Sequence, residues 1–348
     1  MRSISVHFKE VHEKGWSELV RKIKRFCTED KFITNTIPIF FSLLFSLVWA
    51  LPLIMLIRCL KTWRLIRIGE INSRRIGHFC FDASEQLARS KNKPDNVLDW
   101  FWFKEPSSNS HWAKMVKRNL SIYSFTKYLD YWNRFLPGGE EHQRPSSLTN
   151  SRDIEGLFNK TNYRLEFLSN ENDLAKDWLR QKGWRENEPI VCLLVRDSAY
   201  LSQDPLHKGP FGPGHLYHNF RDSKIETFLP AIKWLTDQGA WVLRMGKIME
   251  RRVNVNINRF VDFAFCPEKS DLMDIWLFSN CDLCITTGTG LDTLCEAYQR
   301  PMLELNSLPL LNFRSSSYVI HAPKNLIWKN NRTLLKINEH FENSFHHT

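Results

Sequence analysis

The chain has 348 residues, of which 43% are hydrophobic and 13% aromatic, so it can form about two domains with hydrophobic cores and is not a disordered chain. Its formal net charge of +10 suits nucleic acid, an anionic membrane surface or phosphorylated small molecules as partners. The sequence contains no nucleic-acid-binding motif, so we expect no nucleic-acid partner.

The first 36 residues form a basic segment with an amphipathic stretch at 16–27. One helical face of this stretch carries the apolar side chains Trp16, Leu19, Val20, Ile23 and Cys27, and the other carries Arg21, Lys22, Lys24 and Arg25. This pattern is typical of a helix that lies on an anionic membrane surface, and an ordinary surface helix is the alternative.

Residues 37–60 are expected to form a membrane segment. The run 37–57 contains no charged residue, and its 21 positions are enough for a helix that spans a bilayer. Pro52 is expected to kink it. Basic residues flank the run on both sides, so a single pass and a re-entrant segment both remain open.

Residues 61–180 are expected to form an N-terminal domain of mixed strands and helices. The pattern predicts strands at 65–69 and 97–103, and helices at 83–90 and 111–135. The tract 137–153 has the composition of a loop and is the expected boundary region, and the helical residues up to about 180 can belong to either domain and are counted here with the first.

Residues 181–348 are expected to form a C-terminal Rossmann-like domain. Strands alternate with helices, which predicts a parallel sheet and an α/β fold. Ser223 and Glu226 form a potential capping box, and Ser270 is a second potential helix cap. The predicted strands are 189–195, 240–245, 259–265, 282–286 and 301–305, and the predicted helices are 223–239, a short helix after 270, and 291–298.

Polar residues follow several of these strands at the edge of the sheet where ligands bind in open α/β folds. We expect them to form an anion site: Arg196, Asp197, Arg244, Gly246, Thr287, Gly288, Thr289 and Gly290. The loop 287–290 is expected to present backbone N–H groups at a helix start, where a phosphate binds well. A tight turn is the alternative. The loop is neither a Walker motif nor a dinucleotide fingerprint, since position 293 is Thr.

Two further features bear on chemistry. The loop 204–223 contains three histidines, of which His218 is a candidate base, and we favour substrate contact or proton transfer over metal binding there. Arg221 precedes a predicted helix start, where a basic residue is unfavourable unless an anion is bound nearby. The pair Cys281 and Cys284 lacks the further ligands that a structural zinc site needs, so we expect no metal site.

Several motifs together carry a resemblance. The stretches IRIGEINSRRIGHFCFD, CLLVRDSAYL, YHNFRDSKIETFLPAIKWL, WVLRMG and CDLCITTGTGLDTLCEAYQRP resemble a family of bacterial glycosyltransferases known mainly from surface-polysaccharide gene clusters. The resemblance spans roughly residues 64–312. The arrangement is more distantly similar to two-domain, GT-B-like transferases with paired Rossmann-like halves, including fucosyltransferase-like enzymes.

The resemblance implies that the C-terminal domain binds a nucleotide-sugar and that the N-terminal domain faces the acceptor. It implies that Arg196 holds the donor pyrophosphate, that Gly288–Gly290 contacts phosphate, and that Glu296 binds the ribose. Asp197 or His218 is then the catalytic base. No DxD motif is present, so we expect a metal-independent enzyme without a cofactor, in which arginines neutralise the leaving diphosphate.

We therefore expect a membrane-associated glycosyltransferase that moves a sugar from a nucleotide-sugar to a glycan or lipid-linked acceptor in surface polysaccharide synthesis. It would lie at the inner membrane with its catalytic domain on the cytoplasmic face. Two alternatives remain open. One is a nucleotide-sugar hydrolase or epimerase, which needs no acceptor surface. The other is a non-catalytic, membrane-bound sugar-nucleotide binding protein, which needs no base.

Overall fold

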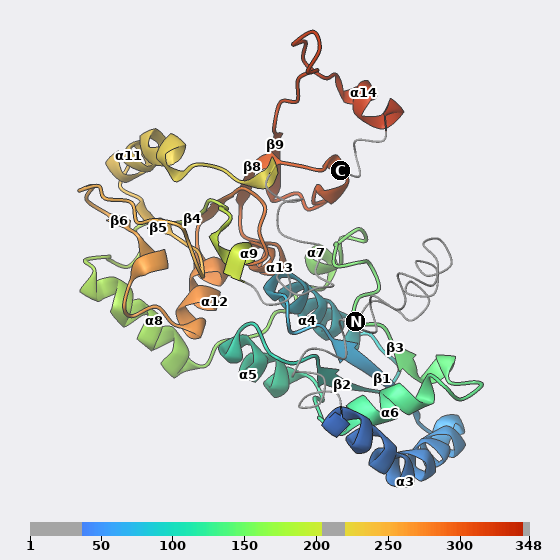
Figure 1. The fold of residues 1–348 in the computed structure, drawn as a ribbon. Helices are drawn as coiled ribbons and strands as arrows, with labels where there is room; N and C mark the ends of the chain where they lie inside the picture. The colour runs from blue at the N-terminus through green and yellow to red at the C-terminus, as the bar shows by residue number, and fades with distance from the viewer. Residues whose placement is uncertain (1–36, 204–219, 344–348) are drawn as a thin grey trace.

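The computed structural model describes residues 37–203 and 220–343, which form two α/β halves (Figure 1). The N-terminal half contains the following elements in chain order: α3 (Ile37–Cys59), β1 (Leu65–Ile71), α4 (Ile76–Ser90), β2 (Val97–Phe103), α5 (Ser110–Asn119), α6 (Thr126–Asn133), β3 (Gln143–Arg144), α7 (Leu157–Thr161) and α8 (Ser169–Gln181). Short 3-10 helices cover Leu60–Thr62 and Glu140–His142.

The N-terminal sheet is small and parallel, with the strand order β2-β1-β3. The expected strands at 65–69 and 97–103 are confirmed as β1 and β2. The helix expected at 111–135 is instead two helices, α5 and α6. The chain between them runs beside β2, where the N–H of Tyr123 donates to the carbonyl of Phe101 over 2.8 Å.

The C-terminal half is a six-stranded parallel sheet with the order β6-β5-β4-β7-β8-β9. Counted along the chain this order is 3-2-1-4-5-6, the strand order of the Rossmann fold. Its elements are β4 (Ile190–Leu194), α9 (Ala199–Gln203), α11 (Leu229–Asp237), β5 (Trp241–Arg244), β6 (Phe260–Val261), α12 (Asp271–Asn280), β7 (Leu283–Thr286), α13 (Thr293–Ala297), β8 (Met302–Ser307), β9 (Val319–Pro323) and α14 (Ile337–Glu342). The 3-10 helices of this half are Ile225–Phe228, Phe263–Phe265 and Leu310–Asn312.

The predicted α/β fold with a parallel C-terminal sheet is therefore confirmed, and the edge strand β9 was not predicted. Ser270 does cap α12, because its Oγ accepts the N–H of Met273 over 3.2 Å. The capping box predicted at Ser223 is wrong. The Ser223 Oγ instead accepts a hydrogen bond from Asn306 on β8, and the chain begins with a 3-10 turn before α11.

Helix α3 packs on the N-terminal half along one of its faces. Ala50, Ile54 and Ile57 form a buried cluster with Ile66 and Ile68 of β1 and with Leu129 of α6. The segment expected as a separate membrane part at 37–60 thus shares a core with the segment 61–180. In Figure 1, α3 lies beside α6 at the end of the molecule remote from the C-terminal sheet.

The two halves share an extensive contact. The expected boundary at residue 180 falls at the end of α8, and this helix packs against the C-terminal half: Trp276 of α12 donates to Asn172 over 2.8 Å. Ser110 at the start of α5 donates through its N–H and its Oγ, each over 2.7 Å, to Asp271 at the start of α12. These contacts hold the edges of both sheets close together, with a cleft between them.

Candidate functional site

A cavity of about 450 Å³ lies between the two halves, at the carboxyl ends of β4 and β7. These two strands flank the point where the strand order of the C-terminal sheet reverses, which is where open α/β sheets bind ligands. The N-terminal half contributes Arg75–His78, Ser108, Asn109 and Asn150–Arg152, and the C-terminal half contributes Leu194–Asp197, Tyr200, Leu201, Arg221, Gly246–Met249, Asp274, Gly288–Leu291, Thr293, Glu296, Glu304 and Asn312–Arg314.

Most of the site residues expected from the sequence meet in this cavity. Those that line it are Arg196, Asp197, Arg221, Gly246, Gly288, Thr289, Gly290 and Glu296. Thr287 is buried beneath the site, where its Oγ1 accepts the N–H of Arg196 over 2.9 Å. His218 lies outside the described residues.

Arg244 lies outside this cavity, although it follows a central strand as expected. It is 1% exposed, forms an ion pair with Asp262 at 3.2 Å, and donates to the carbonyl of Arg251 over 2.8 Å. Its guanidinium also lies over the ring of Phe265. The side chain lines a second hollow that Arg196 and Arg221 do not reach, so the structure does not bring Arg244 together with these two arginines.

The loop 287–290 uses much of its own backbone polarity internally. The N–H groups of Thr287, Gly288 and Thr289 donate to the Leu194 carbonyl, the Thr286 Oγ1 and the Asp292 carboxylate, over 3.1, 3.1 and 2.8 Å respectively. The expectation that this loop presents several free N–H groups is therefore wrong. The Asp292 carboxylate accepts the N–H of Thr289, which is therefore not free for a bound anion, and this contact fixes the loop.

The two glycines of the loop are required for different reasons. Gly288 has φ +75, which favours glycine, and a Cβ there would lie 2.8 Å from Glu304 Oε1. Gly290 has no positive φ, but a Cβ there would lie 2.9 Å from the backbone N of Gly77 at the start of α4. Gly288 thus serves the turn, and Gly290 allows the two halves to approach.

Arg196 and Arg221 provide positive charge beside this loop. Arg196 uses its Nε to bind Asp222 over 3.0 Å, and Arg221 donates to the Gly288 carbonyl over 2.5 Å. Burial and the neighbouring Arg196 lower the pKa of Arg221. Two guanidinium groups that repel each other in a partly buried site favour a bound anion.

A third arginine, Arg314, was not identified from the sequence and is surrounded by carboxylates. It donates to Asp292 and to Glu296, each over 2.5 Å, and lies 3.4 Å from Glu304. Burial raises the pKa of Glu304 to about 7, although Arg314 opposes the shift. Glu296, expected to bind a ribose, is therefore engaged with Arg314 by one carboxylate oxygen.

His78 brings a hydrogen-bond relay to the opposite wall of the cavity. Its Nδ1 lies 2.7 Å from Ser151 Oγ, and Ser151 donates its own proton to Asp82 over 2.7 Å. Because the Ser151 proton points to Asp82, Nδ1 of His78 must be the donor, which leaves Nε2 unprotonated in the neutral ring. Ser146 donates to the other oxygen of Asp82 over 2.8 Å.

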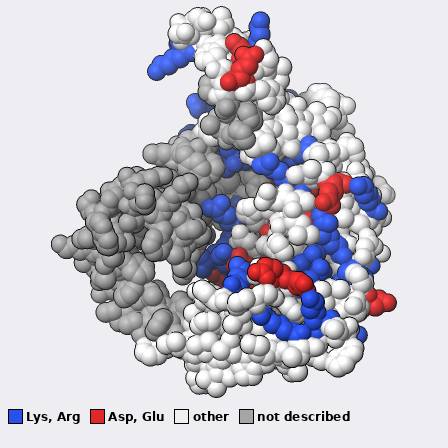
Figure 2. Space-filling model, turned by 90° about the vertical axis from the view of Figure 1, so that its right-hand side faces the viewer, with Lys and Arg blue, Asp and Glu red and all other residues white. Residues whose placement is uncertain are grey.

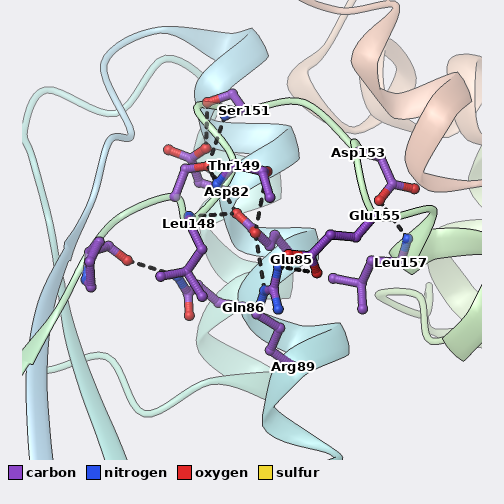
Figure 3. Close-up of polar contacts among 12 residues, drawn as sticks. Asp82, Glu85, Gln86, Arg89, Leu148, Thr149, Ser151, Asp153, Glu155 and Leu157 are labelled. Atoms are coloured by element: carbon purple, nitrogen blue, oxygen red, sulfur yellow. Dashed lines mark hydrogen bonds and ion pairs between the residues drawn. The ribbon is translucent and has the colours of Figure 1, made fainter. Parts of the chain in front are cut away.

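The surroundings of His78 favour its neutral form. Burial, and secondarily Arg75, lower the pKa of His78 below its usual value, so the ring is uncharged at pH 7. Burial raises the pKa of Asp82 to about 6. Figure 3 shows Asp82 and Ser151 facing each other, with Glu85 on the next turn of α4 bound to Thr149 and to the N–H of Leu148. The segment 146–151 is thereby fixed against α4.

Asp197, the other base expected from the sequence, supports the local backbone. Its two oxygens accept the N–H groups of Ala199 and Glu250, each over 3.0 Å. Asp274 at the start of α12 is a further carboxyl in the cavity wall. Its Oδ1 has no partner among the described residues, and burial raises its pKa to about 6. Within residues 37–203 and 220–343 no group of three metal-binding side chains occurs.

His78 follows β1 as Arg196 follows β4, and this is the signal that could have identified it. The pattern of IRIGEINSRRIGH predicts a strand and a turn, and the resemblance implies a Rossmann-like N-terminal half, but His78 was not assigned to the edge of its sheet. The charge of the whole chain is also not confined to the cavity: on the face in Figure 2, Lys and Arg side chains spread over the surface with patches of Asp and Glu between them.

Comparison with known proteins gives distant structural matches. No family model and no curated protein matches the chain. Among solved structures, the ADP-heptose LPS heptosyltransferase II of E. coli is similar with 14% identity and a TM-score of 0.43, covering 81% of this chain and 98% of its own. A glycosyl transferase of family 9 from Veillonella parvula has 10% identity and a TM-score of 0.45, covering 75% and 87%.

A third solved structure, the E. coli heptosyltransferase WaaC with ADP-2-deoxy-2-fluoro heptose, has 9% identity and a TM-score of 0.37, covering 81% and 100%. All three scores lie below 0.5. The function of the chain is therefore inferred from its cavity.

Proposed function

We propose that this chain is a glycosyltransferase that moves a sugar from a nucleotide-sugar to an acceptor at a membrane. The observation that carries the proposal is the composition of the cavity between the two halves: arginines line its C-terminal wall, and a neutral, oriented histidine lines its N-terminal wall. Transfer of a sugar needs both, because a diphosphate leaves on one side and an acceptor hydroxyl loses its proton on the other.

The donor binds along the C-terminal wall. Arg196 and Arg221 neutralise the diphosphate, and Lys247, which reaches across the cavity to the Ser108 carbonyl over 2.6 Å, adds a third positive charge. Asp274 lies in the cavity wall with its Oδ1 unpartnered among the described residues, so it suits a sugar hydroxyl as a partner. Charge-assisted hydrogen bonds from the two arginines and Lys247 stabilise the negative charge that develops on the leaving diphosphate.

His78 serves as the general base. Its Nε2 takes the proton of the acceptor hydroxyl while that oxygen forms a bond to the anomeric carbon of the sugar. The bond from the anomeric carbon to the diphosphate breaks, and its electron pair leaves with the phosphate oxygen. Ser151 and Asp82 hold the ring in the tautomer that can accept the proton, and the lowered pKa keeps Nε2 available at pH 7.

The acceptor is proposed to be lipid-linked or a growing glycan, at the inner membrane, with the catalytic halves on the cytoplasmic side. The apolar segment near the N-terminus supports membrane association, since the stretch from Phe41 to Thr62, which covers most of α3 and the 3-10 turn after it, has a mean hydropathy of 2.3. No metal or cofactor is assigned to the reaction, because arginine and lysine side chains suffice to neutralise the diphosphate.

The experiment is a panel of nucleotide-sugars, including ADP-heptose, incubated with the purified chain with and without bacterial lipid extract. Nucleotide release that depends on the extract, with sugar recovered in the lipid fraction, is the expected result. Release without extract would indicate a hydrolase or an epimerase, and binding without turnover would indicate a sugar-nucleotide binding protein. Either result would overturn the proposal.

His78→Gln should then lower kcat by about a hundredfold to ten-thousandfold, the usual contribution of a general base, with little change in donor affinity. His111→Gln is the matched control, because His111 pairs with Glu171 and does not line the cavity. Equal activity of the two variants would remove His78 from the reaction.

A further inference from the structure

Helix α3 is apolar on the face that it exposes as well as on the face that it buries. Ser46, Ala50, Ile54 and Ile57 recur at helical spacing and are buried against the N-terminal half. The opposite face carries large apolar side chains that are between 43% and 75% exposed: Phe41, Leu44, Phe45, Val48, Met55 and Leu56. A helix on the surface of a soluble domain normally turns polar residues outward, so this face requires an apolar environment.

The N-terminal half contacts α3 along nearly its whole described length. Near one end, Ser42 Oγ lies 2.6 Å from the hydroxyl of Tyr128, and Trp132 donates to Ser46 over 2.9 Å. Near the other end, Arg58 donates to Asn133 over 2.8 Å. Figure 1 shows the consequence, with α3 and α6 lying side by side.

These contacts conflict with a spanning orientation of the docked helix. If α3 crossed the bilayer in this position, α6 would enter the hydrocarbon with it. That helix and its C-terminal cap carry Lys127, Asp130 and Arg134, and charged side chains are costly at that depth. The docked helix fits a membrane when its long axis lies in the plane of the surface.

Exposed aromatic side chains continue the apolar face beyond α3. Trp63 follows the helix and is 76% exposed, and Tyr123, Phe125, Tyr131 and Phe135 are exposed on and around α6. Phe125 contacts Trp49 of α3, with ring centroids 6.5 Å apart, so the two surfaces are continuous. Trp and Tyr favour the headgroup region of a bilayer.

Basic side chains lie at the border of this surface. Three of them are exposed and close in sequence to the aromatic residues: Lys61, Arg64 and Lys127. Lys61 also forms an ion pair with Glu141. Positive charge at the border of an apolar face complements the anionic headgroups of a membrane leaflet.

We propose that the outer face of α3, together with these aromatic residues, inserts into one leaflet of an anionic membrane with the helix parallel to the surface. The chain is then held on the membrane without crossing it in this segment. The inference deepens the membrane association included in the proposed function. It involves no residue of the cavity. Membrane insertion of α3 can therefore be disproved while sugar transfer is confirmed, and sugar transfer can be disproved while insertion is confirmed.

The first test is flotation of the purified full chain with vesicles of phosphatidylethanolamine and phosphatidylglycerol. Phe45→Glu with Val48→Glu should lower the partition coefficient by about tenfold for each side chain, because each loses the burial of a large apolar group. The matched control is Trp234→Glu with Ile320→Glu, which replaces equally exposed apolar residues of the C-terminal half and should leave flotation unchanged.

Unchanged flotation of the α3 variant, with both variants folded by circular dichroism, would overturn the proposal. The proposal would also be overturned if the native chain did not bind vesicles but formed dimers, and the α3 variant was monomeric. The outer face of α3 would then bind a second copy of the chain.

The second test separates an in-plane helix from a spanning one. Phe41→Cys places a thiol near the start of the described apolar run, and the native Cys59 at its end is exposed. An impermeant maleimide added outside sealed vesicles should reach the two sites equally poorly, because an in-plane helix holds both of its ends in the same leaflet, and both sites should react once detergent and denaturant dissolve the vesicles. Labelling of only one of the two sites in vesicles would show a spanning helix and overturn the proposal.

Discussion

The arginines near the same edge of the C-terminal sheet fall into two pairs, which differ in the groups that their side chains bind. Arg196 and Arg221 line the cavity and have a single carboxylate partner between them among the described residues, since Arg196 binds Asp222 through its Nε and Arg221 binds the Gly288 carbonyl, while the terminal nitrogens of Arg244 and Arg314 are held by carboxylates. Arg244 pairs with Asp262, and Arg314 pairs with three acidic side chains. The position at a strand end places the Cα of an arginine near the ligand-binding edge of the sheet. The carboxylates around the side chain then determine whether its guanidinium group is free to bind an anion.

The comparison also assigns separate tasks to the four side chains. A guanidinium whose terminal nitrogens are held by carboxylates contributes to the fold, because its charge is compensated within the protein, whereas Arg196 binds Asp222 through its Nε alone. A guanidinium with a neutral partner, as in the contact of Arg221 with the Gly288 carbonyl, still attracts a phosphate. Substitutions of the two pairs should therefore affect stability and affinity in opposite proportions.

The largest expected effect is on stability. Arg314→Ala should lower the free energy of unfolding by about 3–5 kcal/mol, because it leaves the buried carboxylates of Asp292 and Glu296 without their partner. Urea denaturation measures the loss. Adding Glu296→Gln to this variant should recover part of it, since one of the uncompensated charges is removed. A loss below 1 kcal/mol for Arg314→Ala would contradict the structural role.

The next effect is on affinity. Arg196→Ala should weaken binding of a nucleotide-sugar by about 1.5–3 kcal/mol, the scale of a hydrogen bond to a charged group, with little change in stability. Arg244→Ala is the matched variant, and it should destabilise the fold while the folded protein keeps its affinity. Isothermal calorimetry and thermal melting of the two variants measure both quantities. Equal affinity losses would mean that the distinction between the two pairs is wrong.

A smaller effect is expected at the loop between β7 and α13. Gly288→Ala should cost about 1–2 kcal/mol of stability, because a residue with a Cβ is strained at a φ of +75. Gly290→Ala should act mainly on activity, because its Cβ would press on Gly77 and separate the walls of the cavity. Melting temperature and turnover of the two variants test the difference. An inactive Gly288→Ala variant with unchanged stability would instead place a ligand against that residue.

Much of the C-terminal half could be predicted from the sequence because its signals are local. The buried strands β4, β5 and β7 appear as apolar runs, and Arg196 and Gly288 follow two of them closely. The strand predicted at 259–265 is wrong in its length, because only Phe260–Val261 pairs and a 3-10 turn follows. The edge strand β9 was not predicted, because it is half exposed and lacks such a run. Local pattern also could not show that Asp292 binds the amide of Thr289.

The remaining features depend on contacts between distant segments. Arg314 follows a 3-10 turn with no periodic pattern, and its three carboxylate partners come from a loop, α13 and β8. The relay of His78 requires a serine 73 residues further along the chain. The close approach of Gly290 to Gly77 joins the two halves in the same way. Such pairings follow from the tertiary fold and leave no trace in the periodicity of either segment.

The last expected effect is the pH dependence that Glu304 adds beside Arg314. Burial raises the pKa of its carboxyl to about 7 in the folded chain, above the ordinary value of 4.5. The folded state therefore holds the Glu304 proton more tightly than the unfolded state does. This stabilisation is complete below pH 4.5 and is lost as the pH rises toward 7, with no further change above that.

Glu304→Gln, which cannot ionise, should remove this decline. Its free energy of unfolding relative to the native chain should rise between pH 5 and pH 7.5, and urea denaturation at several pH values measures the difference. Asp237→Asn is the matched control, because Asp237 is an exposed carboxylate on α11 that pairs only with Lys233 among the described residues. A difference between Glu304→Gln and the native chain that stays constant with pH would show that Glu304 does not titrate in this range, and that Arg314 holds all three carboxylates ionised.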